Sequence, residues 1–146
     1  MNLFNVMNVS ESALLAERSR AEVVASNLAN AETTRTPEGG PYRRQEVVFQ
    51  TAPAPQGSFG DALDSFAGQH VHGVEVEKVV ADQAPPVRRF DPSNPDADKE
   101  GYVSYPNINP IAEMTDLMGA SRAYQLNVAA VQATKSMIAT ALTILS

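Results

Sequence analysis

The sequence predicts an α+β protein with long helices at its N- and C-terminal ends, paired as a coiled-coil-like hairpin, and a small β-rich module between them. All ten prolines fall between Pro37 and Pro110, as do seven of the eight glycines, so only the two ends can hold long helices. Apolar residues recur at helical spacing in both ends, and short apolar alternations occupy the middle. Three segments follow: an N-terminal assembly helix (1–34), a central β-rich module with loops (35–106) and a C-terminal assembly helix (107–146).

The N-terminal segment has the pattern of an amphipathic helix. Met7, Leu14, Ala21 and Leu28 recur every seven residues, and the charged residues lie largely on other faces. We expect this helix to begin near residue 3.

Two asparagines mark the end of that helix. Asn27 and Asn30 lie three residues apart and share a helical face, just before a stretch rich in threonine, proline and glycine. One interpretation is that Asn30 ends the helix, because asparagine tolerates the left-handed conformation found at helix ends. The alternative is that both side chains form hydrogen bonds across a contact between subunits.

The central segment contains three predicted strands, Gln45–Phe49, Val74–Val80 and Gly101–Tyr105, each with β-branched or aromatic residues in alternation. A loop with a short helical turn around Asp61 to Phe66 is expected to separate the first two strands.

The C-terminal helix is the more sharply defined of the two. Asn109 can cap it, Pro110 suits its first position, and Glu113 lies near the positive end of the helix dipole. A heptad seam of apolar residues runs along it: Leu117, Tyr124, Val131, Ile138 and Leu145. We expect one helix from Pro110 almost to Ser146. Its few charges indicate that protein covers it on several sides, because a helix of the same chain can cover one face only.

Composition excludes several classes of function. The net charge of −6 disfavours binding to nucleic acid or to anionic membranes. No cysteine is present, so there are no disulfides or thiolate metal sites. The first twenty residues lack the pattern of a cleaved signal peptide, and the uncharged run near the C-terminus is too short to insert into a membrane.

Other polar clusters have simpler explanations than catalysis or recognition. His70 and His72 share a face of an extended segment and could bind a metal, but no third ligand is identifiable. The pairs Arg43–Arg44 and Arg88–Arg89 are expected to be surface charges or to form salt bridges between subunits, since the chain as a whole is acidic. We therefore expect no catalytic residue, no metal and no cofactor.

Two motifs carry a resemblance to a known family. "SNLANAETT" (Ser26–Thr34) and the segment from Asn94 to Met137, with its Gly-Tyr-Val and Pro-Asn elements, resemble the flagellar rod and hook family of axial proteins; the second is similar to proximal-rod components. The resemblance implies a subunit of the basal-body rod, exported unfolded by the flagellar type III apparatus and placed between the inner and outer membranes. It also implies that the terminal helices form the inner layer of a helical tube, where they pack against copies of this chain and against other rod proteins.

The sequence thus predicts a structural, non-enzymatic rod subunit that transmits torque through packed helices. The residues expected at its assembly interface are Asn27, Leu28, Asn30, Leu117, Tyr124, Val131, Ile138 and Leu145. A cytoplasmic coiled-coil adaptor or export chaperone is the alternative. A metal-dependent hydrolase built on His70 and His72 is a third and weaker hypothesis.

Overall fold

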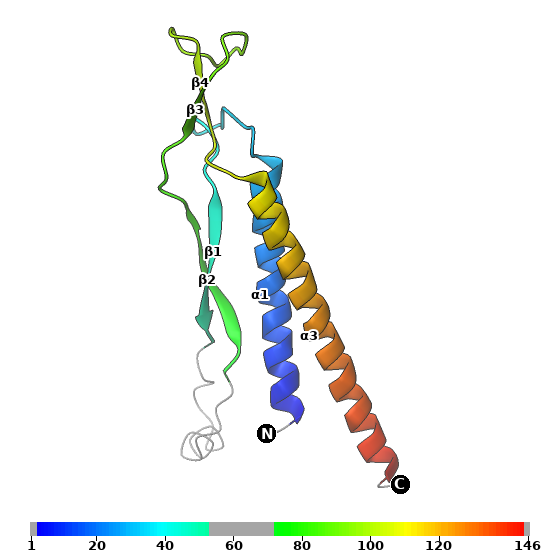
Figure 1. Ribbon diagram of the computed structural model, residues 1–146. Helices are drawn as coiled ribbons and strands as arrows, with labels where there is room; N and C mark the ends of the chain where they lie inside the picture. Colours follow the sequence, from blue (N-terminus) through cyan, green and yellow to red (C-terminus); the bar gives the residue numbers. More distant parts are fainter. Residues whose placement is uncertain (1–2, 53–71, 145–146) are drawn as a thin grey trace. The chain divides into compact units, whose positions relative to one another are not determined.

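A computed structural model describes residues 3–52 and 72–144 of the chain (Figure 1). Its elements are, in order, α1 (Leu3–Ala29), β1 (Gln45–Thr51), β2 (Val74–Ala81), β3 (Val87–Phe90), β4 (Tyr102–Tyr105) and α3 (Pro110–Ile144). Two terminal helices with small sheets between them confirm the α+β class. The coiled-coil pairing of the helices stays a prediction.

Helix α1 begins at residue 3, as the sequence predicts, and ends just before Asn30. The Asn30 side chain donates a hydrogen bond to the carbonyl of Ser26 at 2.9 Å and accepts one from the hydroxyl of Thr33 at 3.2 Å. The expected left-handed conformation at Asn30 is wrong, because no described residue other than glycine has a positive φ. Asn30 lies directly after the helix, and both its backbone N–H and its side chain donate to the carbonyl of Ser26.

Helix α3 begins as predicted, because the Asn109 side chain accepts hydrogen bonds from the N–H groups of Ile111 at 3.0 Å and Ala112 at 3.5 Å. Hydroxyl groups along α3 bond to carbonyls of the preceding turn. Thr134, for example, donates to the carbonyl of Ala130 at 2.9 Å and is buried. Because such bonds satisfy the hydroxyls inside the helix, α3 can present small polar residues to protein neighbours without charged groups.

The chain between the two helices forms two sheets of two strands each. At one end of the β1–β2 pair, Asp82 N–H donates to the carbonyl of Arg44; at the other end, Ala52 N–H donates to the carbonyl of Gly73, so the strands are antiparallel. All three predicted strands are confirmed in place. The predicted helical turn at Asp61 to Phe66 lies outside the described residues.

Strand β3 was not expected from the sequence. It pairs antiparallel with β4, with Val87 opposite Tyr105 and Phe90 opposite Tyr102. All four residues of β3 are exposed, and two of them are arginines, so the segment has no alternation of apolar and polar residues. A strand of this kind is held by backbone pairing and ring contacts, which periodicity does not reveal.

The turn between β3 and β4 is held by its own polar groups. The Asp98 carboxylate accepts hydrogen bonds from the N–H groups of Tyr102 and Glu100, each at 2.9 Å. These bonds, the one from Tyr102 first, together with the nearby Arg88, hold the pKa of Asp98 below its ordinary value. Gly101 has φ +81°, and a Cβ there would lie 2.9 Å from the Phe90 ring, so this position requires glycine.

The chain forms two compact units, and each helix contributes to both. One unit draws on residues 1–19, 49–77 and 121–146, and the other on residues 20–48 and 78–120. The buried side chains of the described residues include no leucine, isoleucine, methionine or aromatic residue: they are Ser10, Ala16 and Thr134 in the first unit, and Val24, Asn27, Val103, Pro106, Glu113 and Ala120 in the second. The larger apolar residues are mostly half-buried or exposed, which leaves much apolar surface open for contacts with other chains.

Candidate functional site

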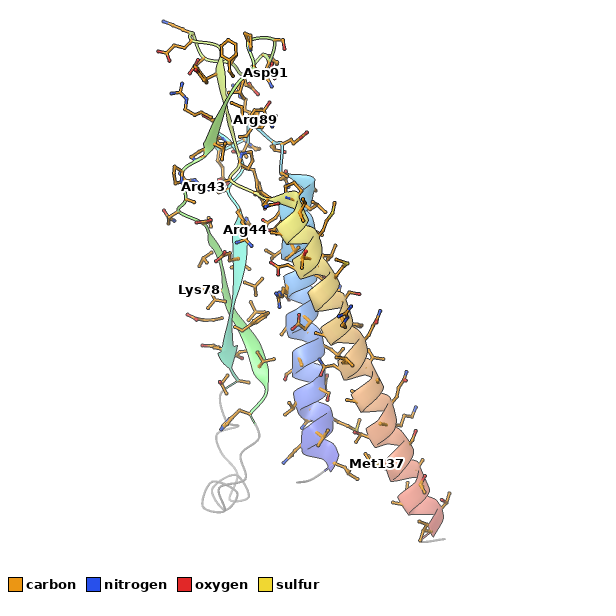
Figure 2. The ribbon with its side chains drawn as sticks, in the orientation of Figure 1. Arg43, Arg44, Lys78, Arg89, Asp91 and Met137 are labelled. Atoms are coloured by element: carbon orange, nitrogen blue, oxygen red, sulfur yellow. The ribbon has the colours of Figure 1, made fainter. Side chains whose placement is uncertain are left out.

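The most highly organised cluster of polar side chains lies in the second unit, where the last turns of α1 approach the first turn of α3 and the start of β1. Figure 1 shows the end of α1 (blue) beside the beginning of α3 (yellow). Arg44, labelled in Figure 2, is the residue directly before β1. Three segments far apart in the sequence therefore meet at this cluster.

Asn27 is the centre of the cluster and has no exposed surface. Its amide nitrogen donates to the carbonyl of Gln45 at 2.8 Å and to the carboxylate of Glu113 at 3.0 Å. Its amide oxygen accepts from the N–H of Gln45 at 2.9 Å and from the hydroxyl of Tyr42 at 3.2 Å. An asparagine side chain has two N–H donors and two acceptor lone pairs, so all of its capacity is used.

Glu113 is a buried carboxylate that accepts hydrogen bonds from two donors, the Asn27 amide and the Arg44 guanidinium. It is 1% exposed, and its second oxygen accepts a charge-assisted hydrogen bond from Nε of Arg44 at 2.6 Å. Burial acts to lower the pKa of Arg44, but the hydrogen bond and charge of Glu113, together with those of Glu46, outweigh it and raise the pKa. The Arg44 guanidinium is therefore held in its protonated form beside the Glu113 carboxylate.

An outer ring of charges surrounds this pair. Arg44 also bonds to Glu46 and lies 3.9 Å from Asp116, which in turn accepts from Arg20 at 3.4 Å. The Arg20 and Asp116 side chains are 37% and 41% exposed, so this contact contributes little by itself. The ring as a whole places acidic side chains of α3 and β1 around Arg44.

The cluster works as a polar latch that joins the end of α1, the start of β1 and the start of α3. Each buried group has its partner, so the latch fixes one register between these segments and disfavours slipped alternatives. Within the two described ranges, no group of three or more acidic, histidine or cysteine side chains could hold a metal ion. No helix of the described chain is long and apolar enough to cross a membrane.

The predicted interface residues fall into two groups. Asn27, Leu28 and Asn30 lie at or next to the latch. The Asn27 side chain forms all of its hydrogen bonds within the chain. Along α3, Tyr124 is 42% exposed, and three seam residues are half-buried: Leu117, Val131 and Ile138. The last seam residue, Leu145, lies outside the described residues, as does His70, the candidate metal ligand. The role of all eight residues in assembly stays a prediction, and for Asn27 it would be indirect.

Arg44 corrects one expectation, because the sequence indicated a surface charge or a salt bridge between subunits. Its side chain is only 23% exposed and bonds within the chain. The second arginine pair also has partners in its own chain: Arg88 lies over the ring of Tyr102 at 5.0 Å and bonds to Asp98, and Arg89 lies over Tyr105 at 4.9 Å.

Sequence reasoning missed Tyr42, Arg44 and Gln45 as members of the latch, and assigned Glu113 only to the helix dipole. The one available signal was the position of Glu113 in a helix with few charges. Its partner could not be identified, because the two residues are 69 positions apart and their contact depends on the fold.

Comparison with protein families identifies the class. Residues 7–35 match the family described as "Flagella basal body rod protein", and residues 99–144 match "Flagellar basal body rod FlgEFG protein C-terminal". The two matches cover most of α1 with the first residues after it, and β4 with α3. The chain is thus an axial protein of the flagellar rod class.

Curated relatives define the family more closely. The flagellar basal-body rod protein FlgC of Borreliella burgdorferi is 43% identical over 153 residues, covering 99% of each chain. The FlgC proteins of Salmonella typhimurium and Bacillus subtilis are 42% and 43% identical, over 99% of this chain and 98% and 99% of theirs. The chain belongs to the FlgC family of flagellar basal-body rod proteins. These relatives support the rod interpretation and not the adaptor or chaperone.

Proposed function

We propose that this chain is a structural subunit of the proximal rod of the bacterial flagellar basal body. The observation that carries the proposal is the identity of 42–43% to rod proteins over nearly the whole length of both chains. The open apolar surface of α3 supports it, since a subunit that assembles must leave its contact surfaces uncovered before assembly.

Assembly proceeds through the terminal helices, which pair as a coiled-coil-like hairpin and build a helical tube with copies of this chain and with other rod proteins. The seam residues Leu117, Tyr124, Val131 and Ile138 support this proposal, because they recur every seven residues and remain half-buried or exposed in the single chain. Close-packed helix contacts resist shear, so a tube of this kind transmits torque.

The three-segment organisation gives each part a role in this proposal. The helices of residues 1–34 and 107–146 carry the assembly contacts, and the module of residues 35–106 decorates the tube. The latch of Asn27, Arg44 and Glu113 holds the ends of the two helices in one register, so that each subunit presents the same surface to its neighbours.

The proposed chemistry is packing rather than catalysis, with no cofactor. The chain would be exported by the flagellar type III apparatus without a cleaved signal peptide and would take its place in the periplasmic part of the basal body. Its partners would be the export apparatus during transit, and copies of itself and other rod proteins afterwards.

The test is to purify intact hook–basal bodies after detergent extraction and to quantify this chain by mass spectrometry. We expect its peptides in a fixed ratio to those of the other rod proteins. Recovery solely in the cytoplasmic fraction, from cells whose rods are intact, would refute the proposal.

A further inference from the structure

The exposed residues of α1 form a single narrow stripe. They are Asn8, Glu11, Leu15, Arg18, Glu22, Ala25 and Ala29, at alternating spacings of three and four residues. The other described side chains of α1 are half-buried or buried. Because this spacing keeps residues on one side of a helix, α1 presents one outward line, which we call the α1 stripe.

Most residues of α3 are exposed. We call the exposed line opposite its buried residues, at spacings of three and four residues, the α3 stripe. It consists of Ile111, Met114, Met118, Arg122, Leu126, Ala129, Ala133, Met137, Thr140 and Ile144, all of them exposed. Met118 is 63% exposed, Leu126 is 67% exposed and Met137, labelled in Figure 2, is 51% exposed. Arg122 is the one charged residue of this stripe. The stripe lies on the side of α3 away from the buried residues Glu113, Ala120 and Thr134.

The two stripes are complementary in charge. Placed antiparallel, with Glu22 of the α1 stripe opposite Arg122 of the α3 stripe, the one cation of α3 meets an anion. Arg18 then lies opposite Leu126, which its aliphatic stem can cover, and no two like charges face one another.

The same register is complementary in size. Leu15 falls opposite Ala129, and Ala25 and Ala29 fall within one residue, about 1.5 Å along the axis, of Met118 and Met114. A large side chain therefore faces a small one on both sides of the central Glu22–Arg122 and Arg18–Leu126 levels, which favours close packing of the two helices there. Charge permits Arg122 to face either Glu11 or Glu22, and size favours Glu22, because the Glu11 alignment would place Leu15 opposite Met118.

We infer that the α3 stripe of one subunit packs antiparallel on the α1 stripe of a second copy of this chain, with Arg122 opposite Glu22. The inference rests on the proposed function and identifies the contact that would join neighbouring copies. Because different surfaces meet, a joined pair of subunits still has one free α1 stripe on one copy and one free α3 stripe on the other. Such a contact propagates into an open helical assembly rather than closing as a dimer. Ile111, Thr140 and Ile144 extend past the α1 stripe and remain for other neighbours.

Cysteine cross-linking tests the register directly, because the chain has no cysteine of its own. The double variant Leu15→Cys/Ala129→Cys is expressed as the full chain in place of the natural one, and purified basal bodies are oxidised and run without reductant. We expect bands at multiples of the single-chain mass. The matched control, Leu15→Cys/Thr140→Cys, moves the second cysteine about 16 Å along the same stripe, and we expect only the single chain, since a disulfide requires Cα atoms within about 7 Å.

Charge reversal provides a second test that does not depend on disulfide geometry. We expect Arg122→Glu and Glu22→Arg each to reduce the amount of the chain in purified basal bodies by about tenfold, because each places like charges opposite one another. The double variant Glu22→Arg/Arg122→Glu restores the pair in reversed order and should recover most of the wild-type amount.

Each contrary outcome has a distinct meaning. Cross-links within a single chain, cross-links to a different protein, or equal cross-linking in the control would overturn the contact between copies. A double charge variant no better than the single variants would overturn it as well. Absence of the wild-type chain from basal bodies would instead refute the proposed rod function, and the contact with it.

Discussion

Replacing Asn27 with alanine is the most informative test of the latch. The substitution removes the group that bonds to the backbone of Gln45, to the carboxylate of Glu113 and to the hydroxyl of Tyr42. Tyr42 retains a contact with Ser26 at 3.3 Å, but the other partners are left without Asn27 in a buried site.

The expected loss follows from the nature of these partners. Each neutral bond to Gln45 contributes about 1 kcal/mol net, and the bond to the charged Glu113 contributes about 1.5 to 3 kcal/mol. We therefore expect Asn27→Ala to lower the free energy of unfolding of the second unit by about 3.5 to 5 kcal/mol, at the upper end for a single substitution. With an m-value of about 2 kcal/mol/M, the urea midpoint would fall by about 2 M.

The assay is urea unfolding of the full chain, followed by the near-ultraviolet circular dichroism of tyrosine. The chain has four tyrosines and no tryptophan, and Tyr42, Tyr102 and Tyr105 all lie in the second unit. Asn127→Ala is the matched control, because the Asn127 side chain makes one bond, to the carbonyl of Ala123 in its own helix, and alanine favours the helix. A loss below about 1 kcal/mol for Asn27→Ala, or one no larger than in the control, would refute the latch.

Three further outcomes are expected. Gly73→Ala should destabilise the first unit by about 1 to 3 kcal/mol, because the new Cβ would lie 2.5 Å from the Ser12 hydroxyl oxygen, whereas Gly119→Ala, with open space around it, should be neutral or stabilising; thermal unfolding compares them. Protonation of Asp98 should loosen the β3–β4 turn: its folded-state pKa lies below the ordinary 3.8, so its contribution is complete above that pH and is lost as pH falls through the lower folded value. The protection of the turn amides, relative to their intrinsic exchange rates at each pH between 5 and 2, follows this, and Asp98→Asn should remove the pH dependence of that protection. Tyr124→Asp should abolish incorporation into basal bodies, measured by mass spectrometry, and normal swimming of the variant would count against the seam.

Much of the secondary structure could be predicted from local patterns. The absence of proline from both ends, the heptad spacing and the cap at Asn109 located α1 and α3 closely at the ends that the structure describes. Alternation located β1, β2 and β4. These features depend on residues within a few positions of one another, so they are readable without the fold.

Strand β3 and the way α1 ends were not predictable in the same way. Residues Val87–Phe90 form a strand because β4 supplies hydrogen-bonding partners and the rings of Tyr102 and Tyr105 stack with Arg88 and Arg89. Local sequence preference is weaker than such pairing.

The sequence by itself determined that this chain has two long helices with sparse charge, a proline-rich β module between them and the motifs of a flagellar rod protein. Only the tertiary structure decided that Asn27, Arg44 and Glu113 form one latch, and that the exposed residues of α1 fall on one narrow stripe. The physical reason is the distance along the sequence between the residues that determine each feature. Helix periodicity and caps are set by neighbours along the chain, whereas a buried carboxylate finds its guanidinium through folding of segments 69 residues apart.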